Sequence, residues 1–471
     1  MVVVGAGLGG LAAAARLARL RHEVTVLEQA DRVGGKLNTR SAGGFTWDTG
    51  PSLITLPAAL RDLFRKTGRP LDDVLELVPV DPLVRYRFPD GTMLDLPHAG
   101  RHDVLAAIGD TLGGRAADEW GALLDRAGRM WQAVRRPFLE QPFAGWRTLL
   151  GQVRDVPTIA PGRTLRGLGR RSLSDPRLRL LLDRYATYTG SDPRRAPAAL
   201  AVIPYVEHTF GGWYAPGGLY RIAEAVRDRA LLRGAVVRTG ADVVAVTESG
   251  GRVDGVRLAN GSTLAADVVV ANADATHLYR DLLPRPRLVP RGQPSLSGFV
   301  VLLGLRGRTP GLAHHTVLFP AHYDAEFDAV FGPEPGPPDD PAVYVSAPDD
   351  PALRPHDDAE AWFVLVNAPV HAAVHAAVPG RVDWDAPALA AAYADHLLDR
   401  LADRGLDVRE RVVVRETRTP ADLARATRAP GGAIYGTASH GARAAFLRPA
   451  NRSPVRGLFL VGGSAHPGGG L

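Results

Sequence analysis

The chain has 471 residues, which is too long for a single ordinary hydrophobic core, so two packed domains are expected. Its hydrophobic content of 45% is typical of a globular protein. It contains no cysteine, which excludes disulfide bonds and thiol catalysis. The formal net charge of +6 comes almost wholly from arginine and does not by itself indicate a nucleic-acid partner. No apolar run reaches the roughly eighteen residues that cross a bilayer, and the first residues already form a strand, so no secretory signal is expected.

The chain begins with the strand, turn and helix of a dinucleotide-binding unit. Three valines at 2–4 predict a strand buried on both faces of a parallel sheet, and LAAAARLARL at 11–20 predicts a helix. Between them, Gly5, Gly7 and Gly10 keep the G-x-G-x-x-G spacing. The first glycine permits the tight turn, the second lets backbone approach a pyrophosphate, and the third lets the helix pack against its strand. The helix N-terminus then favours phosphate.

The second strand supports this interpretation. EVTVLE at 23–28 ends at Glu28, and an acid at this place accepts hydrogen bonds from a ribose hydroxyl. A glycine triplet alone matches many loops by chance. The combination of the glycine triplet, the two flanking strands and the acid predicts a nucleotide-binding βαβ unit rather than an ordinary glycine-rich turn.

The next segments favour a flavin over a nicotinamide cofactor. Residues 31–36, DRVGGK, offer adjacent glycines and positive charge for a second backbone approach to the pyrophosphate. Residues 44–52, GFTWDTGPS, add another turn where a nicotinamide dehydrogenase would continue its sheet. We therefore predict FAD as the cofactor. The binding residues expected from these N-terminal segments are Gly5, Gly7, Gly9, Gly10, Glu28, Gly34, Gly35, Lys36, Gly50 and Pro51.

The remaining pattern predicts an α/β protein with an interrupted cofactor domain. The stretch from about 85 to 220 carries Arg, Leu, Ala and Trp at helical spacing, whereas 236–274 alternates apolar and polar residues as a β-meander does. Strands and an amphipathic helix follow from 295 to about 425. We predict a two-dinucleotide-binding, Rossmann-like FAD domain and an inserted substrate-binding domain of mixed sheet and helices. The expected ranges are 1–80, 221–290 and 430–471 for the FAD domain, and 81–220 and 291–429 for the substrate-binding domain.

Five segments in this order carry a resemblance to a known family: the N-terminal fingerprint, DRVGGK, FTWDTGPS, YAPGGLYRI at 214–222 and LFLVGGSAHPGGG at 458–470. The chain resembles the phytoene desaturase family along its whole length. These are the bacterial-type carotenoid desaturases, with the related hydroxycarotenoid desaturases, carotenoid oxygenases and retinol saturases. The closing GGSAHPGGG favours a later-acting carotenoid desaturase. The resemblance implies FAD-dependent desaturation of a long isoprenoid, such as phytoene or a hydroxylated carotene, with hydride transfer to the flavin in carotenoid biosynthesis.

The resemblance also implies further cofactor contacts. It places the C-terminal glycine-rich loop against the flavin through Gly462, Gly463, His466, Pro467 and Gly468, although His466 could equally be a structural turn histidine. In two-dinucleotide flavoproteins the backbone of the β-meander bonds the adenine, which makes Val243 the candidate here. The alternative is a meander without ligand contact. Because the family continues with proline and a final helix, we expect the chain to be incomplete after Leu471.

Catalytic residues are harder to predict, because desaturation acts on carbons without an ionisable group. The protein has to bind an apolar chain in register and accept a proton. Asp175 and Arg179, four residues apart, resemble the family region in which an acid and an arginine act near the flavin. The alternative is a helix N-terminal acid in a surface ion pair. Glu207 is a second candidate acid.

No metal site is predicted. His371 and His375 have the i, i+4 spacing of helical metal ligands, but no convincing third ligand follows them.

The expected partners are a hydrophobic isoprenoid or carotenoid and a membrane surface, with no nucleic acid. Residues 129–150 mix arginines with Trp and Phe, a composition that suits attachment to anionic lipid; the alternative is the solvated face of a helical cap. We expect the protein in the cytoplasm, peripheral on the inner face of the cell membrane.

Two other functions fit parts of the pattern. One is a flavin amine oxidase or protoporphyrinogen-oxidase-like enzyme. The other is a non-catalytic prenyl-binding protein, but such a protein would have a degraded fingerprint, and this fingerprint is intact.

Overall fold

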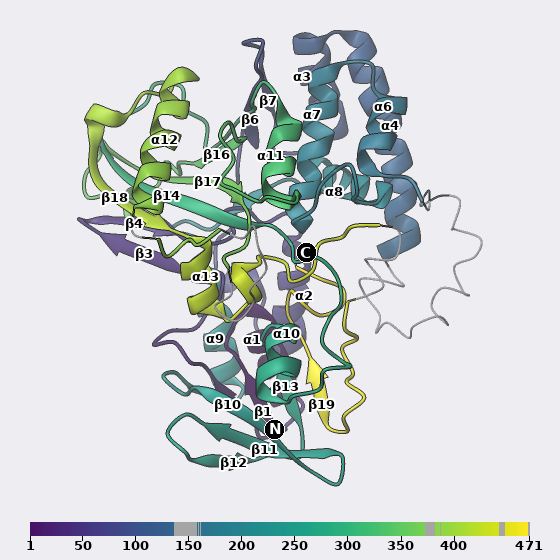
Figure 1. Cartoon of the computed structure of the whole chain (residues 1–471), viewed down its shortest axis with the longest axis vertical. Coiled ribbons are helices and arrows are strands. Elements are labelled where there is room, and N and C mark those ends of the chain that lie inside the picture. Colours follow the sequence, from purple (N-terminus) through teal and green to yellow (C-terminus); the bar gives the residue numbers. More distant parts are fainter. Residues whose placement is uncertain are drawn as a thin grey trace.

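The computed structural model describes residues 1–135, 158, 160, 162–372, 382–386, 388–441 and 448–469. Figure 1 shows three regions: a parallel sheet with its helices at the bottom, a larger mixed sheet at upper left, and a group of helices at upper right. Both sheets combine with helices, which confirms the predicted α/β class with a Rossmann-like domain.

The lower region is built on a five-stranded, wholly parallel sheet. The strands, in spatial order, are β19 (Leu458–Leu460), β13 (Val269–Ala271), β1 (Val2–Val4), β2 (Thr25–Leu27) and β9 (Val236–Arg238). Alternation along β1 places Val3 in the core with helices α1 and α9, and Val2 and Val4 in the core on the opposite face. The elements that cover the two faces are α1 (Leu8–Arg19) and α9 (Tyr220–Leu232) on one side, and β10 (Val243–Ser249), β11 (Arg252–Leu258), β12 (Thr263–Ala265) and α10 (Ala275–His277) on the other.

The upper sheet has seven strands and is mixed. One pair of neighbouring strands, β15 (His315–Leu318) and β6 (Val84–Arg87), is parallel, and the other pairs of the sheet are antiparallel. Its strands, in spatial order, are β18 (Val412–Arg418), β14 (Ser297–Arg306), β17 (Ala359–Ala368), β16 (Val343–Ser346), β15 (His315–Leu318), β6 (Val84–Arg87) and β7 (Met93–Leu96). Helix α12 (Leu389–Asp403) packs on one face, where Leu397 and Leu401 meet Phe299 and Trp362.

Helices pack against the β6–β7 end of this sheet and form a cap. The cap consists of α3 (Arg101–Leu112), α4 (Gly114–Val134), α6 (Leu165–Ser172), α7 (Pro176–Arg184) and α8 (Val202–Phe210). Its core joins Trp120 and Leu178 to strand residues such as Tyr86. The remaining elements are β3 (Thr39–Ala42), β4 (Phe45–Asp48), α2 (Pro57–Thr67), β5 (Val78–Pro79), β8 (Trp213–Tyr214), α11 (Tyr323–Phe331), α13 (Pro420–Thr427), and the short helices η1 (Leu71–Asp73), η3 (Tyr185–Thr189), η4 (Ala198–Ala201), η5 (Leu278–Leu282), η6 (Pro351–Leu353), η7 (Arg409–Arg411) and η8 (Pro430–Gly432).

The β3–β4 hairpin lies closer to the upper sheet than its place in the chain suggests. Trp47 donates its indole N–H to the Leu303 carbonyl on β14 at 3.1 Å, and a side chain at Gly304 would meet the Phe45 ring at 2.6 Å. The hairpin falls within the predicted FAD domain, yet it packs on the seven-stranded sheet, whose strands fall within the predicted substrate-binding domain. It therefore ties the two together.

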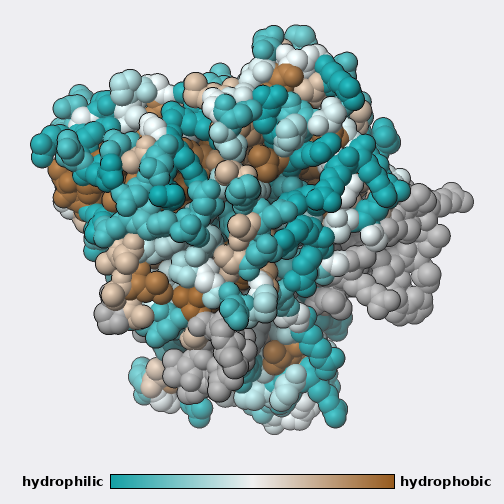
Figure 2. All heavy atoms as spheres, turned by 45° about the horizontal axis from the view of Figure 1, so that its top comes forward, coloured by the Kyte–Doolittle hydropathy of each residue, from teal (hydrophilic) through white to brown (hydrophobic). Residues whose placement is uncertain are grey.

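Within the described parts of the chain, no helix has both the length and the apolar character needed to cross a bilayer. Hydrophobic residues on the face shown in Figure 2 form separate small patches on a mainly hydrophilic surface. Of the aromatic, arginine-rich stretch 129–150, residues 136–150 lie outside the described residues.

Candidate flavin and substrate site

A large cavity, of about 1250 Å³, lies where the parallel sheet, the upper sheet and the helical cap meet. The carboxyl ends of β1, β13 and β19 open onto it, as expected for a ligand site of a doubly wound sheet. Most residues predicted to bind the cofactor line this cavity although they lie far apart in the sequence. They are Gly5, Gly7, Gly9, Glu28, Gly34, Gly35, Lys36, Gly50, Pro51, Val243, Gly462, Gly463, His466, Pro467 and Gly468.

Two glycine positions show why these loops need the smallest residue. Gly10 does not line the cavity; a Cβ there would lie 2.2 Å from the Gly5 carbonyl oxygen, so its role is the close contact between helix and loop. Gly34 has a φ of +114° and a Cβ would meet the Leu37 carbonyl oxygen at 2.2 Å. Gly34 also forms a bridge with Gly7, which places the DRVGGK segment directly beside the fingerprint.

Asn272 joins the first glycine-rich loop to the last. Its side-chain amide donates to the Gly5 carbonyl oxygen at 3.3 Å. A Cβ on Gly7 would lie 2.8 Å from the amide nitrogen of Asn272, and one on Gly462 would lie 2.6 Å from its amide oxygen. No motif in the sequence pointed to this residue. Its one signal is its place directly after the buried strand at 269–271, at the sheet edge where ligands bind.

Glu28 is fixed at the end of β2. Its carboxylate accepts backbone N–H bonds from Ala6 at 2.7 Å and Ala30 at 3.0 Å, and the residue is 7% exposed. Val243, at the start of β10, lines the same part of the cavity, and the Glu28 carbonyl accepts from the Ala241 N–H at 2.8 Å. This arrangement suits the ribose and adenine contacts predicted for Glu28 and Val243, which stay predictions.

Two cations, the half-buried Lys36 and the buried Arg448, contribute positive charge to the cavity. Lys36 donates from Nζ to the carbonyl oxygens of Ala433, at 3.2 Å, and Ile434. Arg448 donates to the carbonyls of Tyr435 and Gly463, each at 2.8 Å. Burial lowers the pKa of both groups, and the nearby Asp274 opposes that shift. Such cations, with the N-terminus of α1, favour a pyrophosphate. Lys36 was predicted from its motif, whereas Arg448 stands in no motif.

The C-terminal loop is anchored by backbone contacts. The His466 N–H donates to the Pro449 carbonyl at 2.9 Å, and the His466 carbonyl accepts from the Asn451 amide at 2.7 Å. His466 is buried and lines the cavity together with Pro467. A flavin contact by this histidine stays a prediction.

Two segments that carried the family resemblance meet beside the cavity. The Asp48 carboxylate, from FTWDTGPS, accepts the N–H groups of Leu219 at 2.7 Å and Tyr220 at 3.1 Å, both from YAPGGLYRI. These N–H groups lie at the start of α9, where a carboxylate is stabilised. Burial raises the pKa of Asp48 to about 6.

Asp175 and Arg179 do not line the cavity. Asp175 caps α7: its carboxylate accepts the Arg177 N–H at 2.8 Å and pairs with the Arg177 guanidinium at 2.7 Å. Arg179 instead donates to the Leu173 carbonyl at 2.7 Å. These contacts match the alternative of a helix N-terminal acid in an ion pair, with Arg177 and not Arg179 as the partner. Their placement therefore gives no support to the predicted catalytic role.

Glu207 is completely buried in α8, and it too is absent from the cavity lining. Its carboxylate accepts the Tyr185 hydroxyl at 2.6 Å. Burial raises the pKa of Glu207 to about 7, opposed by the Tyr185 hydrogen bond and the charge of Arg184.

The part of the cavity between the cap and the upper sheet is mostly apolar. Its apolar lining comes from helices α4, η4 and α8 and from strands β14 and β17: Trp131, Val134, Leu200, Val202, Ile203, Val206, Val300, Phe363 and Leu365. The polar residues on this side include Ser52, Arg184, Thr187, Tyr188, Thr189, His315, Tyr344 and Asn367. An apolar cavity with a few convergent polar groups is the usual form of a small-molecule site.

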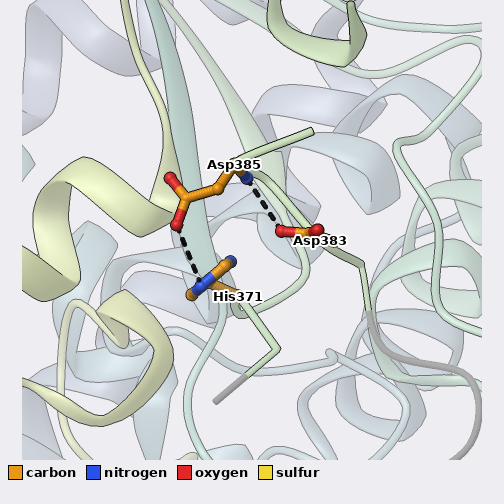
Figure 3. Close-up of side chains that lie close together, drawn as sticks. All are labelled: His371, Asp383 and Asp385. Atoms are coloured by element: carbon orange, nitrogen blue, oxygen red, sulfur yellow. Dashed lines mark hydrogen bonds and ion pairs between the residues drawn. The ribbon is translucent and has the colours of Figure 1, made fainter. Parts of the chain in front are cut away.

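A second polar cluster lies elsewhere, around His371 (Figure 3). His371 Nε2 lies 3.5 Å from Asp385, and Asp383 accepts the Asp385 N–H at 3.0 Å. The Trp384 N–H donates to His371 Nδ1 at 3.2 Å, and Arg425 pairs with Asp385 at 2.6 Å. Protein groups already satisfy these atoms, so we assign no metal to the cluster. His375 lies outside the described residues.

The fold and the glycine-lined cavity define an FAD-dependent oxidoreductase. Comparison with known proteins agrees. Residues 8–299 match the family described as flavin containing amine oxidoreductase. The chain is 35% identical to a hydroxyneurosporene desaturase of Cereibacter sphaeroides, over the whole of this chain and 94% of the relative. It is 33% identical to a 4,4'-diapolycopene oxygenase of Methylomonas sp, over the whole chain and 95% of the relative, and to a zeta-carotene-forming phytoene desaturase of Myxococcus xanthus, over the whole chain and 90% of the relative.

Solved structures show the same fold at low sequence identity. Putrescine oxidase bound to putrescine aligns with a TM-score of 0.61 and 18% identity, over 98% of this chain and 92% of that one. An oxidoreductase from Methanosarcina mazei aligns with a TM-score of 0.61 and 16% identity, over 99% and 96% of the two chains. The chain therefore belongs to the flavin-containing amine oxidoreductases and, within them, to the bacterial-type carotenoid desaturase family.

Proposed function

We propose that this protein desaturates a long isoprenoid of the carotenoid class, such as phytoene or a hydroxylated carotene, in carotenoid biosynthesis. The observation that carries the proposal is full-length similarity to carotenoid desaturases and an oxygenase, combined with a mainly apolar cavity that continues from the flavin-binding loops. Bound FAD would accept the hydride equivalent that the reaction removes.

The chain's own residues supply binding and shielding. The loops around Gly5, Gly34 and Gly462 would hold the pyrophosphate and flavin by backbone contact, and Lys36 and Arg448 would balance negative charge. Side chains such as Ile203 on α8 and Phe363 on β17 would hold the polyene and exclude water. An apolar substrate needs such a surface, because it offers almost no hydrogen bonds.

The amine-oxidase alternative has a specific obstacle in this cavity. An amine substrate binds as an ammonium cation, and the region between the cap and the upper sheet contains the buried guanidinium of Arg184. A like charge in a desolvated site opposes binding of a cation. The structures of putrescine oxidase and its relatives support a shared fold and do not bear on the substrate.

We also propose that the protein works in the cytoplasm, attached peripherally to the inner face of the cell membrane. A polyene substrate resides in the bilayer, so extraction requires contact with it. On the cap, Phe210 is 39% exposed and lies beside Trp131, with 6.5 Å between the ring centroids, and Trp131 lines the cavity. An exposed aromatic side chain such as Phe210 suits the headgroup region of a bilayer. Flotation with anionic liposomes would test this: the protein should float with them, and recovery in the lipid-free fraction would contradict attachment.

The catalytic proposal is tested by incubating the FAD-loaded protein with liposomes that carry phytoene or a hydroxylated acyclic carotene, and by analysing the pigments by HPLC and absorbance. New polyenes with red-shifted absorbance are expected. Putrescine and protoporphyrinogen serve as comparison substrates. Unchanged polyenes together with turnover of either comparison substrate would overturn the proposal.

A further inference from the structure

One charged side chain in the apolar part of the cavity has no hydrogen-bond partner. Arg184, the last residue of α7, lines the cavity and is 8% exposed. Its Nε has no hydrogen-bond partner, and among the described residues its guanidinium makes no hydrogen bond or ion pair. The guanidinium carbon lies 5.6 Å from the centroid of the Tyr344 ring and 5.9 Å from that of Tyr188. Those ring faces stabilise the charge but leave its N–H donors free.

This arrangement differs from that of three other cations in the same cavity. Lys36 and Arg448 donate to backbone carbonyls, and Arg428 pairs with Asp242 at 2.7 Å. A buried guanidinium with unused donors is costly, because it has lost water without gaining acceptors. A ligand that carries an acceptor would remove that cost, whereas a pure hydrocarbon would not.

A chain of hydrogen bonds lies beside Arg184. The Ser52 and Tyr344 hydroxyls are 2.5 Å apart, and the Tyr344 hydroxyl is 2.8 Å from His315 Nδ1. His315 lines the cavity and is 1% exposed, and its other ring nitrogen, Nε2, has no hydrogen-bond partner. The cluster therefore holds two residues with unpartnered nitrogens, Arg184 Nε and His315 Nε2, and both residues contact Tyr344. A guanidinium only donates, whereas an imidazole nitrogen can donate or accept, so the pair matches an oxygen that can do both.

We propose that Arg184 and His315 bind the hydroxyl oxygen at one end of the carotenoid and thereby make the enzyme selective for a hydroxylated substrate. This rests on the proposed function and adds two specificity-determining residues to it. Without the oxygen, the buried donors stay unpaired, and a site built to bond a substrate hydroxyl discriminates strongly against the analogue that lacks it. The surrounding apolar lining accommodates the polyene itself.

The test uses two substrates that differ in one group: an acyclic carotene and the same carotene with a terminal hydroxyl, each in liposomes. The variants are Arg184→Met, which keeps length and removes the donors, Arg184→Lys, which restores a charge, and His315→Phe. Arg170→Met, at an exposed residue of α6 that does not line the cavity, is the control. We measure kcat/KM for both substrates, together with bound flavin and its absorbance spectrum.

The wild-type and Arg170→Met proteins should prefer the hydroxylated carotene. Arg184→Met should lose at least about tenfold in kcat/KM on that substrate and less than about twofold on the hydrocarbon, with unchanged flavin. Arg184→Lys should recover part of the preference, and His315→Phe should lower it.

Three results would overturn the inference while carotenoid desaturation stands. One is a wild-type protein with no preference for the hydroxylated carotene. The second is an equal loss on both substrates in Arg184→Met, and the third is a change in its flavin spectrum, which would assign Arg184 to packing or to the cofactor. If Arg184→Met fails to fold, an unchanged substrate ratio in Arg184→Lys and His315→Phe overturns the inference. A wild-type protein that converts neither carotenoid contradicts the proposed function itself.

Discussion

The side-chain amide of Asn272 donates to the Gly5 carbonyl oxygen at 3.3 Å, which connects the end of β13 to the first turn of the chain. The same amide lies against the backbone at Gly462, more than 450 residues after Gly5 in the sequence. The glycine-rich loops at the two ends of the chain are therefore spaced by one polar side chain. That spacing sets the distance between the two loops where they line the cavity.

Replacing Asn272 with Ala should weaken FAD binding. The variant removes a hydrogen bond to a loop carbonyl and the spacer between the two loops, so we expect the free energy of unfolding to fall by about 1 kcal/mol and the Kd for FAD to rise about tenfold. Titration of flavin fluorescence measures the Kd. Asn260→Ala, in an exposed turn whose Asn also makes a hydrogen bond, is the control and should leave the Kd unchanged. Equal FAD binding by both variants would contradict the spacing role.

Glu28 provides a second test of the cofactor cradle. In Glu28→Ala the carboxylate that would bond the ribose is lost, along with its contacts to the N–H groups of Ala6 and Ala30. We expect the purified variant to retain markedly less FAD, measured as flavin released per chain. Glu23→Gln, at an exposed residue close in the sequence, should retain the wild-type amount. Full flavin content in Glu28→Ala would show that the ribose contact does not exist.

The buried acid Glu207 predicts a pH dependence of stability. Its pKa is raised from 4.5 to about 7 in the folded protein, so between these pH values the folded chain holds a proton that the unfolded chain releases. Stability from this group is greatest below pH 4.5 and falls as pH rises through 7, by on the order of 3 kcal/mol. Glu207→Gln keeps an acceptor for Tyr185 and should lose less stability than wild type between pH 5 and 8 in denaturant titrations. Glu76→Gln, at an exposed acid, is the control and should behave as wild type. Identical pH profiles for Glu207→Gln and wild type would refute the buried-acid explanation.

Substitutions of Asp175 distinguish a helix-capping role of this residue from a catalytic one. Asp175→Ala should lower the free energy of unfolding by about 1 kcal/mol through loss of the cap on α7, with kcat/KM per bound flavin unchanged. Asp175→Asn keeps a capping side chain and should retain most of the stability. A tenfold loss of activity in both variants, at full flavin content, would instead restore the acid–base role predicted from the sequence.

Local patterns in the sequence predict many of the residues that line the cavity. Three features depend only on neighbouring backbone, so their spacing can be recognised in the sequence. They are the strand–glycine–helix pattern at 2–20, the paired glycines Gly34 and Gly35, and the acid Glu28. They also line one cavity in the folded protein. The α/β class followed from the same patterns, because β-branched runs and helical periodicity are local properties.

Residues that act through tertiary contacts left no such signal. Asn272, Arg448 and Arg184 reach the cavity only because distant strands and helices bring them there. The sequence leaves the role of Asp175 open for a related reason: an acid that begins a helix looks the same in sequence whether it caps the helix or transfers a proton. The sequence analysis assigns residues 39–48 to the FAD domain by their position in the chain, because their contacts with Leu303 and Gly304 of β14 are tertiary and leave no local signal.

Anaerobic mixing of the FAD-loaded protein with a carotene in liposomes tests the central claim most directly. The account predicts that the absorbance of oxidised flavin falls while the polyene absorbance shifts to the red, with one new double bond for each flavin reduced. Flavin that stays oxidised in the presence of both the hydrocarbon and the hydroxylated carotene, but is reduced by an amine, would contradict it.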